Sequence, residues 1–328
     1  MSTKRKLDSY FGPVDRKKAR VPSDTDDAES CSTAELPLEK SSHFTYPFPV
    51  PHLPQSIIES LATVPATDGK VIDDQLNLNL LYFQPFIPQA AERGLFEFLR
   101  GELFFYRVNY KIKRGSFEAD INTPRYTTVF GVDTSALFTE AGLLVDSQTG
   151  NQVAKDRWNC QPRPIPQCLD YLRRLTEIFT DASYNFCLVN YYANGADSIS
   201  YHSDDERFLG AHPSIASLSL GATRDFCMRH KPITPTAGEK PPEQNLKTPL
   251  KMPLASGDMV LMKGKTQSSW LHSIPKRTGK GNEGGRINIT FRKGVKRYAT
   301  ENYMQYNVGS GKVYKWDGQK KEMRIWTV

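Results

Sequence analysis

Short apolar runs at close spacing fill the second half of this chain, and this pattern restricts the fold more than any other feature. Each run has the length of a strand rather than of a helix. Many short strands that follow helices predict a double-stranded β-helix, or jelly roll, with helices packed outside, so the fold class is α+β and mainly β. The runs cover residues 186–192, 198–202, 215–220, 225–229, 259–262 and 286–292.

Helical periodicity precedes these strands and predicts three helices. Ser56 is the expected N-cap of a short helix over residues 57–61. A second helix is expected after Pro88 and a third after Pro166. The apolar residues that give these two helices a buried face are Leu95, Phe96 and Leu99 in one, and Leu169, Leu172, Leu175 and Phe179 in the other.

The segments around the helices carry one more strand and two loops. Residues 106–113 alternate in polarity and predict a strand that ends in a turn at Arg114-Gly115. Residues 133–157 are expected to form a loop or an insertion. The Pro- and Lys-rich residues 231–251 are expected to form a long loop between two strands.

The predicted strand at residues 286–292 has two chemically different faces. Its side chains alternate between polar and apolar, so the apolar ones can pack against a core. The polar face presents two guanidinium groups that suit a small dianion. A half-exposed strand with a solvated face would show the same alternation, so the pattern alone does not establish a site. The polar members are Arg286, Asn288, Thr290 and Arg292.

Two histidines and an aspartate form a candidate metal site. His202 and Asp204 are two positions apart at the end of a predicted strand, so their side chains point to the same side. His272, from another strand, would complete a 2-His-1-carboxylate facial triad, which leaves positions on Fe(II) for an organic cosubstrate and dioxygen. Asn190 and Tyr192 share a face of the preceding strand. A His-x-Asp triplet alone is most often solvated, so the prediction depends on all these features together.

The ordered set of motifs resembles the AlkB family of Fe(II)/2-oxoglutarate-dependent dioxygenases over roughly residues 105–293, and most closely its eukaryotic DNA-repair branch. The motifs are NYYANGADSISYHSDDE, SLSLGATRDFCMRH, GDMVLMKGKTQSSWLHSIPKR and GGRINITFRK. The resemblance implies that His202, Asp204 and His272 bind iron, and that 2-oxoglutarate and O2 are cosubstrates. It implies 2-oxoglutarate binding by Asn190, Tyr192, Arg286, Asn288, Thr290 and Arg292, with Arg286 and Arg292 meeting the carboxylates.

The resemblance also implies a reaction: oxidative removal of alkyl groups from nucleic-acid bases. Bases such as 1-methyladenine and 3-methylcytosine carry a positive charge, which the carboxylates of Asp205 and Glu206 beside the iron would favour. Pro124-Arg125 and the residues after it resemble the start of the family's base lid, so Arg125 is a candidate base-contacting residue.

The remaining contacts with nucleic acid are expected upstream. Residues 106–113 stand where the family has a DNA-probing hairpin, so Val108, Tyr110 or Ile112 is a candidate wedge between base pairs. The same residues would equally fit the core or surface of an ordinary strand. Trp158 is the candidate aromatic residue for stacking on the base, and residues 133–157 have no clear counterpart in the family.

The first 42 residues lack apolar periodicity and predict a disordered basic tail. Two basic clusters in it, Lys4-Arg5-Lys6 and Arg16-Lys17-Lys18-Ala19-Arg20, resemble a bipartite nuclear-import signal and predict a nuclear protein. A degenerate motif for docking on the sliding clamp of replication, with Lys4 in place of the expected glutamine, is formed by Leu7, Tyr10 and Phe11.

Composition limits the class of protein. The chain has a net charge of +7, which favours a polyanionic partner, and no apolar run near the ~20 residues that a membrane-spanning helix needs. Its N-terminus does not suit a signal peptide. Five scattered cysteines without a CxxC pair argue against a disulfide framework or structural zinc, and favour a reducing compartment. A monomer is expected.

These features predict three regions: the tail at 1–42, a dioxygenase domain at 43–293 and an extension at 294–328. Within the domain we expect a nucleotide-recognition region at about 104–160 and a β-helix core at about 184–293. The extension mixes basic and aromatic residues, and either contacts a nucleic-acid strand or folds over the barrel.

Three other functions share this catalytic core. The first is an RNA base demethylase, which only the upstream recognition region would distinguish. The second is an oxygenase that acts on a protein side chain, against which Asp205, Glu206 and the basic net charge argue. The third is a binding module with an inactive site, against which the intact triad and both arginines argue.

Overall fold

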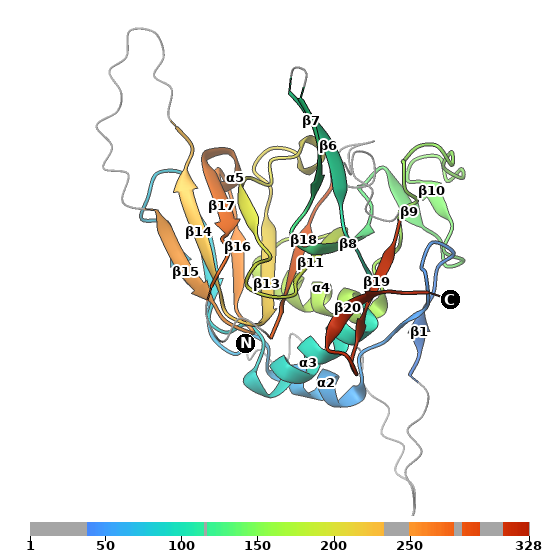
Figure 1. The fold of residues 1–328 in the computed structure, drawn as a ribbon, viewed down its shortest axis with the longest axis horizontal. Helices are drawn as coiled ribbons and strands as arrows, with labels where there is room; N and C mark the ends of the chain where they lie inside the picture. Colours follow the sequence, from blue (N-terminus) through green and yellow to red (C-terminus); the bar gives the residue numbers. More distant parts are fainter. Residues whose placement is uncertain (1–37, 115–116, 233–248, 279–283, 296–310, 328) are drawn as a thin grey trace, which may run out of the picture.

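Two antiparallel sheets form the frame of the protein (Figure 1). The computed structural model describes residues 38–114, 117–232, 249–278, 284–295 and 311–327. In this part of the chain, the larger sheet has ten strands in the order β20-β19-β5-β8-β11-β18-β13-β16-β4-β3, and the smaller has four in the order β12-β17-β14-β15. Two sheets that enclose a site between them, with helices outside, confirm the predicted jelly roll.

The strands of the larger sheet are short, and β11, β13, β16 and β18 among them follow the predicted runs closely. In chain order they are β3 (Lys70–Ile72), β4 (Leu80–Phe83), β5 (Phe105–Tyr106), β8 (Tyr126–Gly131), β11 (Phe186–Tyr192), β13 (Ile215–Gly221), β16 (Met259–Met262), β18 (Arg286–Arg292), β19 (Val313–Asp317) and β20 (Glu322–Ile325).

The smaller sheet and three separate strand pairs complete the β structure of the described residues. The smaller sheet contains β12 (Ile199–His202), β14 (Arg224–His230), β15 (Leu250–Leu254) and β17 (Trp270–Ile274). The separate pairs are β1 (Lys40–Ser41) with β2 (Val50–Pro51), β6 (Asn109–Arg114) with β7 (Phe117–Asn122), and β9 (Ala136–Phe138) with β10 (Leu144–Asp146).

The three predicted helices are present and lie together below the larger sheet in Figure 1. They are α2 (Gln55–Ser60), α3 (Gln89–Glu102) and α4 (Gln167–Thr180); a short α5 (Thr266–Ser269) and the 3-10 turns η1 (Leu61–Thr63) and η2 (Arg207–Leu209) are added. Pro88 and Pro166 directly precede α3 and α4, as predicted. The predicted N-cap at Ser56 is wrong. The N-cap of α2 is Pro54, and Ser56 already lies inside the helix.

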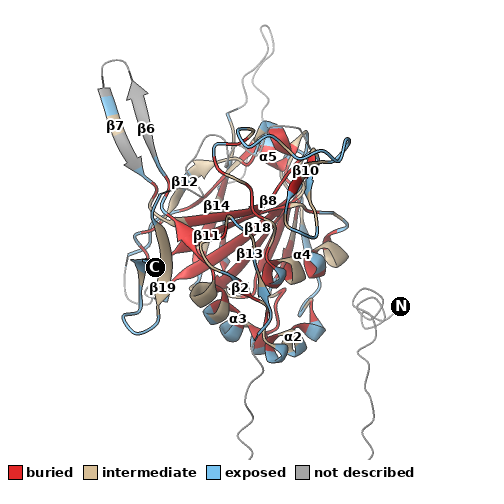
Figure 2. Ribbon diagram, turned by 90° about the vertical axis from the view of Figure 1, so that its right-hand side faces the viewer, coloured by how far each residue is buried: buried red, intermediate tan, exposed pale blue. Residues whose placement is uncertain are grey.

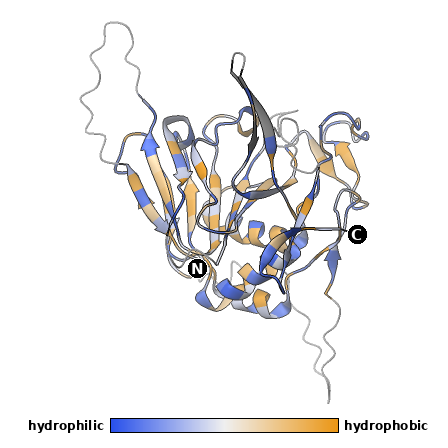
Figure 3. Ribbon diagram, viewed as in Figure 1, coloured by the Kyte–Doolittle hydropathy of each residue, from blue (hydrophilic) through white to orange (hydrophobic). Residues whose placement is uncertain are grey.

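Both faces of the central strand β18 are buried, as the buried strands in the middle of Figure 2 illustrate. Its apolar residues are 0% exposed and belong to the hydrophobic core. Its polar residues, Arg286, Asn288, Thr290 and Arg292, are only 1–8% exposed and line a cavity between the two sheets. Figure 3 shows that hydrophilic and hydrophobic residues are mixed along the strands and helices. These burial values exclude the alternative that residues 286–292 form a half-exposed strand with a solvated polar face.

The recognition region differs in detail from the prediction. The expected strand at residues 106–113 divides into β5 and β6, because the chain leaves the larger sheet after Tyr106. From there β6 and β7 project beyond the body of the molecule (Figure 1). The expected turn at Arg114-Gly115 lies partly outside the described residues. Residues 133–157, expected to be a loop, contain the β9–β10 pair.

The described structure begins before residue 43, where the domain was expected to start. Lys40 pairs with Pro51, so this short strand pair already belongs to the domain. Residues 1–37, with the basic clusters and the clamp-docking motif, lie outside the described residues. Much of the expected loop at residues 231–251 lies outside them too, and its end forms β15.

The C-terminal extension folds onto the domain. β19 pairs with β5, so β19 and β20 extend the larger sheet at one of its two edges. The Arg100 guanidinium carbon lies 4.0 Å from the centre of the Trp316 ring, and the Tyr314 ring lies 5.2 Å from that of Tyr126. These aromatic side chains are used for packing, in agreement with a tail folded over the barrel.

The cysteines in the described residues are free thiols. Cys168 and Cys187 are fully buried, and burial raises the pKa of the Cys168 thiol to about 12. Such thiols are unreactive at neutral pH. Among the described residues, no helix combines the length and the apolar character needed to cross a membrane.

Gly131 offers a test of the fold around the site. It ends β8 with a φ of +85°, and a Cβ there would lie 2.1 Å from the Asn185 carbonyl oxygen. We expect Gly131→Ala to lower the free energy of unfolding by about 3 kcal/mol, because backbone strain and a backbone clash combine. Gly101→Ala in α3 is the control, because its Cβ would meet no atom within 4 Å outside the helix backbone. Equal stability of the two variants in chemical denaturation would contradict this account.

Candidate active site

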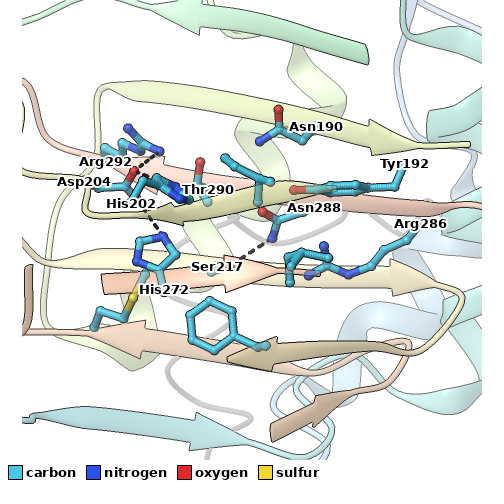
Figure 4. A pocket seen from close by; sticks show the side chains of 14 residues that line it. Asn190, Tyr192, His202, Asp204, Ser217, His272, Arg286, Asn288, Thr290 and Arg292 are labelled. Carbon is cyan, nitrogen blue, oxygen red and sulfur yellow. Dashed lines mark hydrogen bonds and ion pairs between the residues drawn. The ribbon is translucent and has the colours of Figure 1, made fainter. Parts of the chain in front are cut away.

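Two histidines and an aspartate converge between the ends of β12 and β17. The two strands are antiparallel and place His202 directly opposite His272, while Asp204 follows β12 by two residues. Nε2 of His202 lies 3.7 Å from Oδ1 of Asp204, and Nε2 of His272 lies 3.8 Å from Oδ2 (Figure 4). The three ligand atoms all lie within 4.8 Å of one another. The predicted triad is therefore assembled so that one cation can contact all three side chains.

Neighbouring groups hold these ligands in place. Nδ1 of His202 lies 2.9 Å from the Ser200 carbonyl oxygen, which requires a proton on Nδ1 and leaves Nε2 as the metal-binding atom. The backbone N–H of Asp204 donates to Oε1 of Gln267 over 2.9 Å. Gln267, on α5, is a site residue that sequence reasoning missed, because its direction depends on how this short helix sits.

The charges around the triad suit a divalent cation. Burial favours the neutral form of Asp204, but the Arg292 guanidinium and the two imidazoles outweigh it and hold its pKa below the usual range. Burial, together with the neighbouring His202, lowers the pKa of His272 to about 3. At neutral pH the site therefore offers a carboxylate and a neutral imidazole, which are the forms that bind metal.

A cavity next to the triad is lined by all the residues that the sequence assigned to 2-oxoglutarate (Figure 4). Antiparallel pairing aligns β11 with β18, so Asn190 lies opposite Asn288 and Tyr192 opposite Arg286. The triad itself forms one end of the cavity. Its lining includes Asn190, Tyr192, Ser217, Arg286, Asn288, Thr290 and Arg292, together with Phe226 and Met262, which the sequence did not single out.

The donors in this cavity fit a small dianion. Nη2 of Arg286 donates to Oγ of Ser219 over 2.8 Å. Nε and Nη1 of Arg286 and Nε of Arg292 are buried without a hydrogen-bond acceptor among the described residues. Burial lowers the pKa of Arg286 only to about 10, so it stays charged at neutral pH. Buried cations with unused donors match the two carboxylates of 2-oxoglutarate.

Arg292 joins the cavity to the metal ligands. Its Nη2 lies 3.0 Å from Oδ1 of Asp204, and its Nη1 donates to Oε1 of Glu206 over 3.2 Å. The same guanidinium that the sequence assigned to 2-oxoglutarate therefore also contacts the carboxylate of the triad. The carboxylates of Asp204 and Glu206 and the guanidinium of Arg292 therefore lie on the same side of the segment that follows β12.

A second, larger cavity lies beside the first, and both cavities are lined by residues of the triad. The two cavities have Asn190, Ile199, His202, Asp204 and Arg292 in common. The further walls come from the roots of β6 and β7, the start of β8, and β12. They include Val108, Thr123, Pro124, Arg125, Leu188, Tyr201 and Glu206. The cavity therefore connects two of the triad residues, His202 and Asp204, with the base of the projecting β6–β7 pair.

The structure brings part of the predicted base-contacting set to this cavity. Arg125 lines it, and its Nε donates to Oδ1 of Asn190 over 3.2 Å. Glu206 lines it too. Asp205 does not: its side chain is 55% exposed and accepts a bond of 2.9 Å from Nζ of Lys231. The backbone alternates here, so the residue between Asp204 and Glu206 points outward.

The other predicted contacts lie elsewhere. Trp158 is 4% exposed, belongs to the hydrophobic core and lines neither cavity, so its position does not support base stacking. Val108 is a buried wall of the larger cavity rather than an exposed wedge. The side chains of Tyr110 and Ile112 lie outside the described part of the structure, and a wedge there stays a prediction.

Asp204→Ala tests the metal site directly. Because the substitution removes one of three ligands, we expect the affinity of the full-length protein for Mn²⁺ to fall more than about 100-fold, beyond the loss typical of outer-shell changes. Isothermal titration calorimetry measures this. Asp205→Ala is the matched control, because that neighbouring carboxylate points away from the site and pairs with Lys231. A similar loss in both variants would remove Asp204 from the ligand set.

Comparison with known proteins agrees with this geometry. Residues 79–292 match the model of the 2OG-Fe(II) oxygenase superfamily. The chain is 29% identical over 245 residues to the DNA oxidative demethylase ALKBH2 of Arabidopsis thaliana, covering 72% of each chain. It is 34% identical over 172 residues to ALKBH2 of Bos taurus, covering 52% of this chain and 54% of that one.

A third relative matches over a shorter segment. The chain is 42% identical over 125 residues to the human alpha-ketoglutarate-dependent dioxygenase alkB homolog 3, covering 37% of this chain and 40% of the relative. The facial triad, the polar strand face and these relatives lead to one conclusion. The chain belongs to the 2OG-Fe(II) oxygenase superfamily and, within it, to the AlkB family of dioxygenases.

Proposed function

We propose that this protein removes methyl groups from 1-methyladenine and 3-methylcytosine in DNA, as a direct reversal of alkylation damage. One observation carries the proposal. The larger cavity reaches the metal triad from the side where the β6–β7 pair projects, and it has Glu206 in its wall. Relatives named DNA oxidative demethylase support the same class of substrate.

The polar strand face would hold the cosubstrate. When bound, Fe(II), 2-oxoglutarate and O2 together supply the oxidant that hydroxylates a carbon attached to nitrogen. Arg286 and Arg292 would bind the carboxylates, with Asn190, Tyr192, Asn288 and Thr290 around them. The apolar layer behind β18 keeps these residues at fixed positions. The protein thus supplies binding, orientation and a closed site.

The larger cavity would hold the damaged base. Its apolar walls, Val108, Leu188 and Ile199, suit the faces of an aromatic ring. The carboxylate of Glu206 would accept a hydrogen bond from the exocyclic amine and favour the positive charge of the methylated ring. After hydroxylation, the carbon–nitrogen bond of the N-hydroxymethyl group breaks, which releases formaldehyde and restores the base.

The base must leave the helical stack to reach this cavity. Unstacking costs a few kcal/mol, which contacts between a projecting hairpin and the nucleic acid can offset. The β6–β7 pair, which starts at the cavity wall beside Val108 and Thr123, stands in a suitable place. This favours DNA over a protein substrate, while an RNA demethylase with the same core stays a direct alternative for the assay below.

We also propose that the protein acts as a monomer in the nucleus. The basic clusters between Lys4 and Arg20 would direct import, and Leu7, Tyr10 and Phe11 would contact the sliding clamp. Both motifs precede the first strand of the domain at Lys40 in the sequence, so they can be deleted without removing that strand.

The proposed reaction is tested with oligonucleotides that carry one 1-methyladenine, incubated with the full-length protein, Fe(II), 2-oxoglutarate and ascorbate. Mass spectrometry reads the loss of the methyl group from single-stranded DNA, duplex DNA and RNA in parallel. We expect loss on DNA with the wild-type protein and none with Asp204→Ala. Faster loss on RNA would support the RNA alternative, and slow succinate formation without methyl loss would point to another substrate.

The same assay separates the two neighbouring carboxylates. We expect Glu206→Gln to reduce kcat/KM for 1-methyladenine at least tenfold, because the change removes a charged hydrogen bond worth about 1.5–3 kcal/mol. Asp205→Asn should leave kcat/KM nearly unchanged, since Asp205 pairs with Lys231 outside the cavity. Equal losses in the two variants would remove Glu206 from base recognition.

Deleting residues 1–37 tests the proposal on localisation. The deletion keeps β1, so we expect unchanged turnover of short oligonucleotides and a loss of nuclear accumulation of a fluorescent fusion. Full nuclear accumulation of the truncated protein would contradict an import signal in this segment. Loss of turnover would mean that the tail contributes to the active site.

A further inference from the structure

Arg224, the first residue of β14, is a buried cation that lines neither cavity of the active site. It is 2% exposed, and its guanidinium donates to three backbone carbonyl oxygens. Nη1 donates to the oxygen of Asn194 over 3.2 Å, and Nη2 donates to those of Asp197 and Pro275 over 2.7 Å each. One side chain therefore connects two separate segments of the chain.

Both segments lead to metal ligands. Asn194 and Asp197 belong to the loop between β11 and β12. The last residue of β12 is the metal ligand His202. Pro275 directly follows β17, which carries His272. The guanidinium thus fixes the distance between the loop before one histidine strand and the end of the other.

The same loop leads to the cosubstrate cavity. It runs from Tyr192 to Ile199, and both of these residues line that cavity. The Tyr192 ring lies close to two buried guanidiniums, with its centre 5.4 Å from Cζ of Arg286 and 5.6 Å from Cζ of Arg224. Movement of this loop would therefore shift a wall of the 2-oxoglutarate site as well as a metal ligand.

Backbone hydrogen bonds also hold the loop, and one of them, from the Arg277 N–H to the Gly195 carbonyl oxygen over 2.8 Å, leads to the segment after β17. The Ala193 N–H donates to Oδ2 of Asp197 over 2.8 Å, within the loop itself. The Ser198 N–H donates to the Pro124 carbonyl oxygen over 2.9 Å. The Asn194 carbonyl oxygen accepts from Arg224 and also from the Asp197 N–H over 3.2 Å. The carbonyl of the buried Asp197 accepts from Arg224, and a buried carbonyl that loses its donor is costly.

We propose that Arg224 is a positioning residue, which holds the β11–β12 loop against the end of β17 so that Tyr192 and His202 stand correctly for cosubstrate and metal. It acts through the loop and touches neither ligand. A planar guanidinium is required, because its fixed fork serves three acceptors at once, whereas the single ammonium of a lysine cannot reach all three in the same directions. The inference concerns 2-oxoglutarate and metal, so it does not depend on which base is the substrate.

Arg224→Lys is the decisive variant, because it keeps the charge and removes the fork. We expect the affinity of the Mn²⁺-loaded full-length protein for 2-oxoglutarate, measured by calorimetry, to fall about 10- to 100-fold, as for other residues that orient ligands from behind. Affinity for Mn²⁺ alone should fall as well. Circular dichroism and thermal melting establish that the variant is folded.

Two further variants sharpen the test. Arg277→Met is the matched control, because this exposed arginine, two residues beyond Pro275, donates a single side-chain bond of 2.9 Å to the Thr223 carbonyl. Its affinities should equal those of the wild type. Arg224→Met removes both charge and fork, and we expect a loss as large as in Arg224→Lys or larger.

Two results would overturn the proposal. One is wild-type affinity for 2-oxoglutarate and Mn²⁺ in a folded Arg224→Lys protein, whatever Arg224→Met does, since the charge alone would then suffice. The other is an equal loss in Arg277→Met, which would show a general sensitivity of this end of the sheet. If Arg224→Met does not fold, Arg224→Lys alone decides. Neither readout uses a methylated base, so failure of the proposed demethylation would be seen separately.

Discussion

The structure depends on the burial of two guanidinium groups on one strand. A charged group in a protein interior is costly unless it is paired, and Arg286 and Arg292 keep unused donors there. Their burial is possible because the other face of β18 packs into the hydrophobic core. Arg286 has Ser219 on β13 as a partner, and Arg292 has the carboxylates of Asp204 and Glu206. The site therefore contains buried cationic donors that lack an acceptor, and the carboxylates of the cosubstrate would supply it.

Much of this could be predicted from the sequence, because the decisive signals are local and periodic. Alternation along residues 286–292 placed four polar side chains on one face, and the two-residue spacing of His202 and Asp204 placed two ligands on one side. The starts of α3 and α4 followed from Pro88 and Pro166 in the same way. Such patterns report which direction a side chain takes within its own element.

The failures have the opposite character, because they concern relations between elements. Asp205 seemed equivalent to Glu206, yet the direction of the backbone after β12 sends it to Lys231. Trp158 looked available for stacking, but it packs in the core. Gln267 and Arg224 lie within motifs that resemble the family, but no local pattern singles them out. Their importance follows only from the carbonyls and amides that the folded chain brings to them.

The edge pairing of the larger sheet has a consequence for biogenesis. β5 at residues 105–106 pairs with β19 at residues 313–314, so partners about 200 positions apart must meet. β18, the strand that joins β11 to β13, is likewise synthesised about 100 positions after β11. A growing chain on the ribosome would thus carry unpaired strand edges until β18 and β19 have emerged, and such edges are prone to aggregation. Because β18 also carries the polar face of the site, completion of the centre of the sheet and competence to bind ligands should appear together.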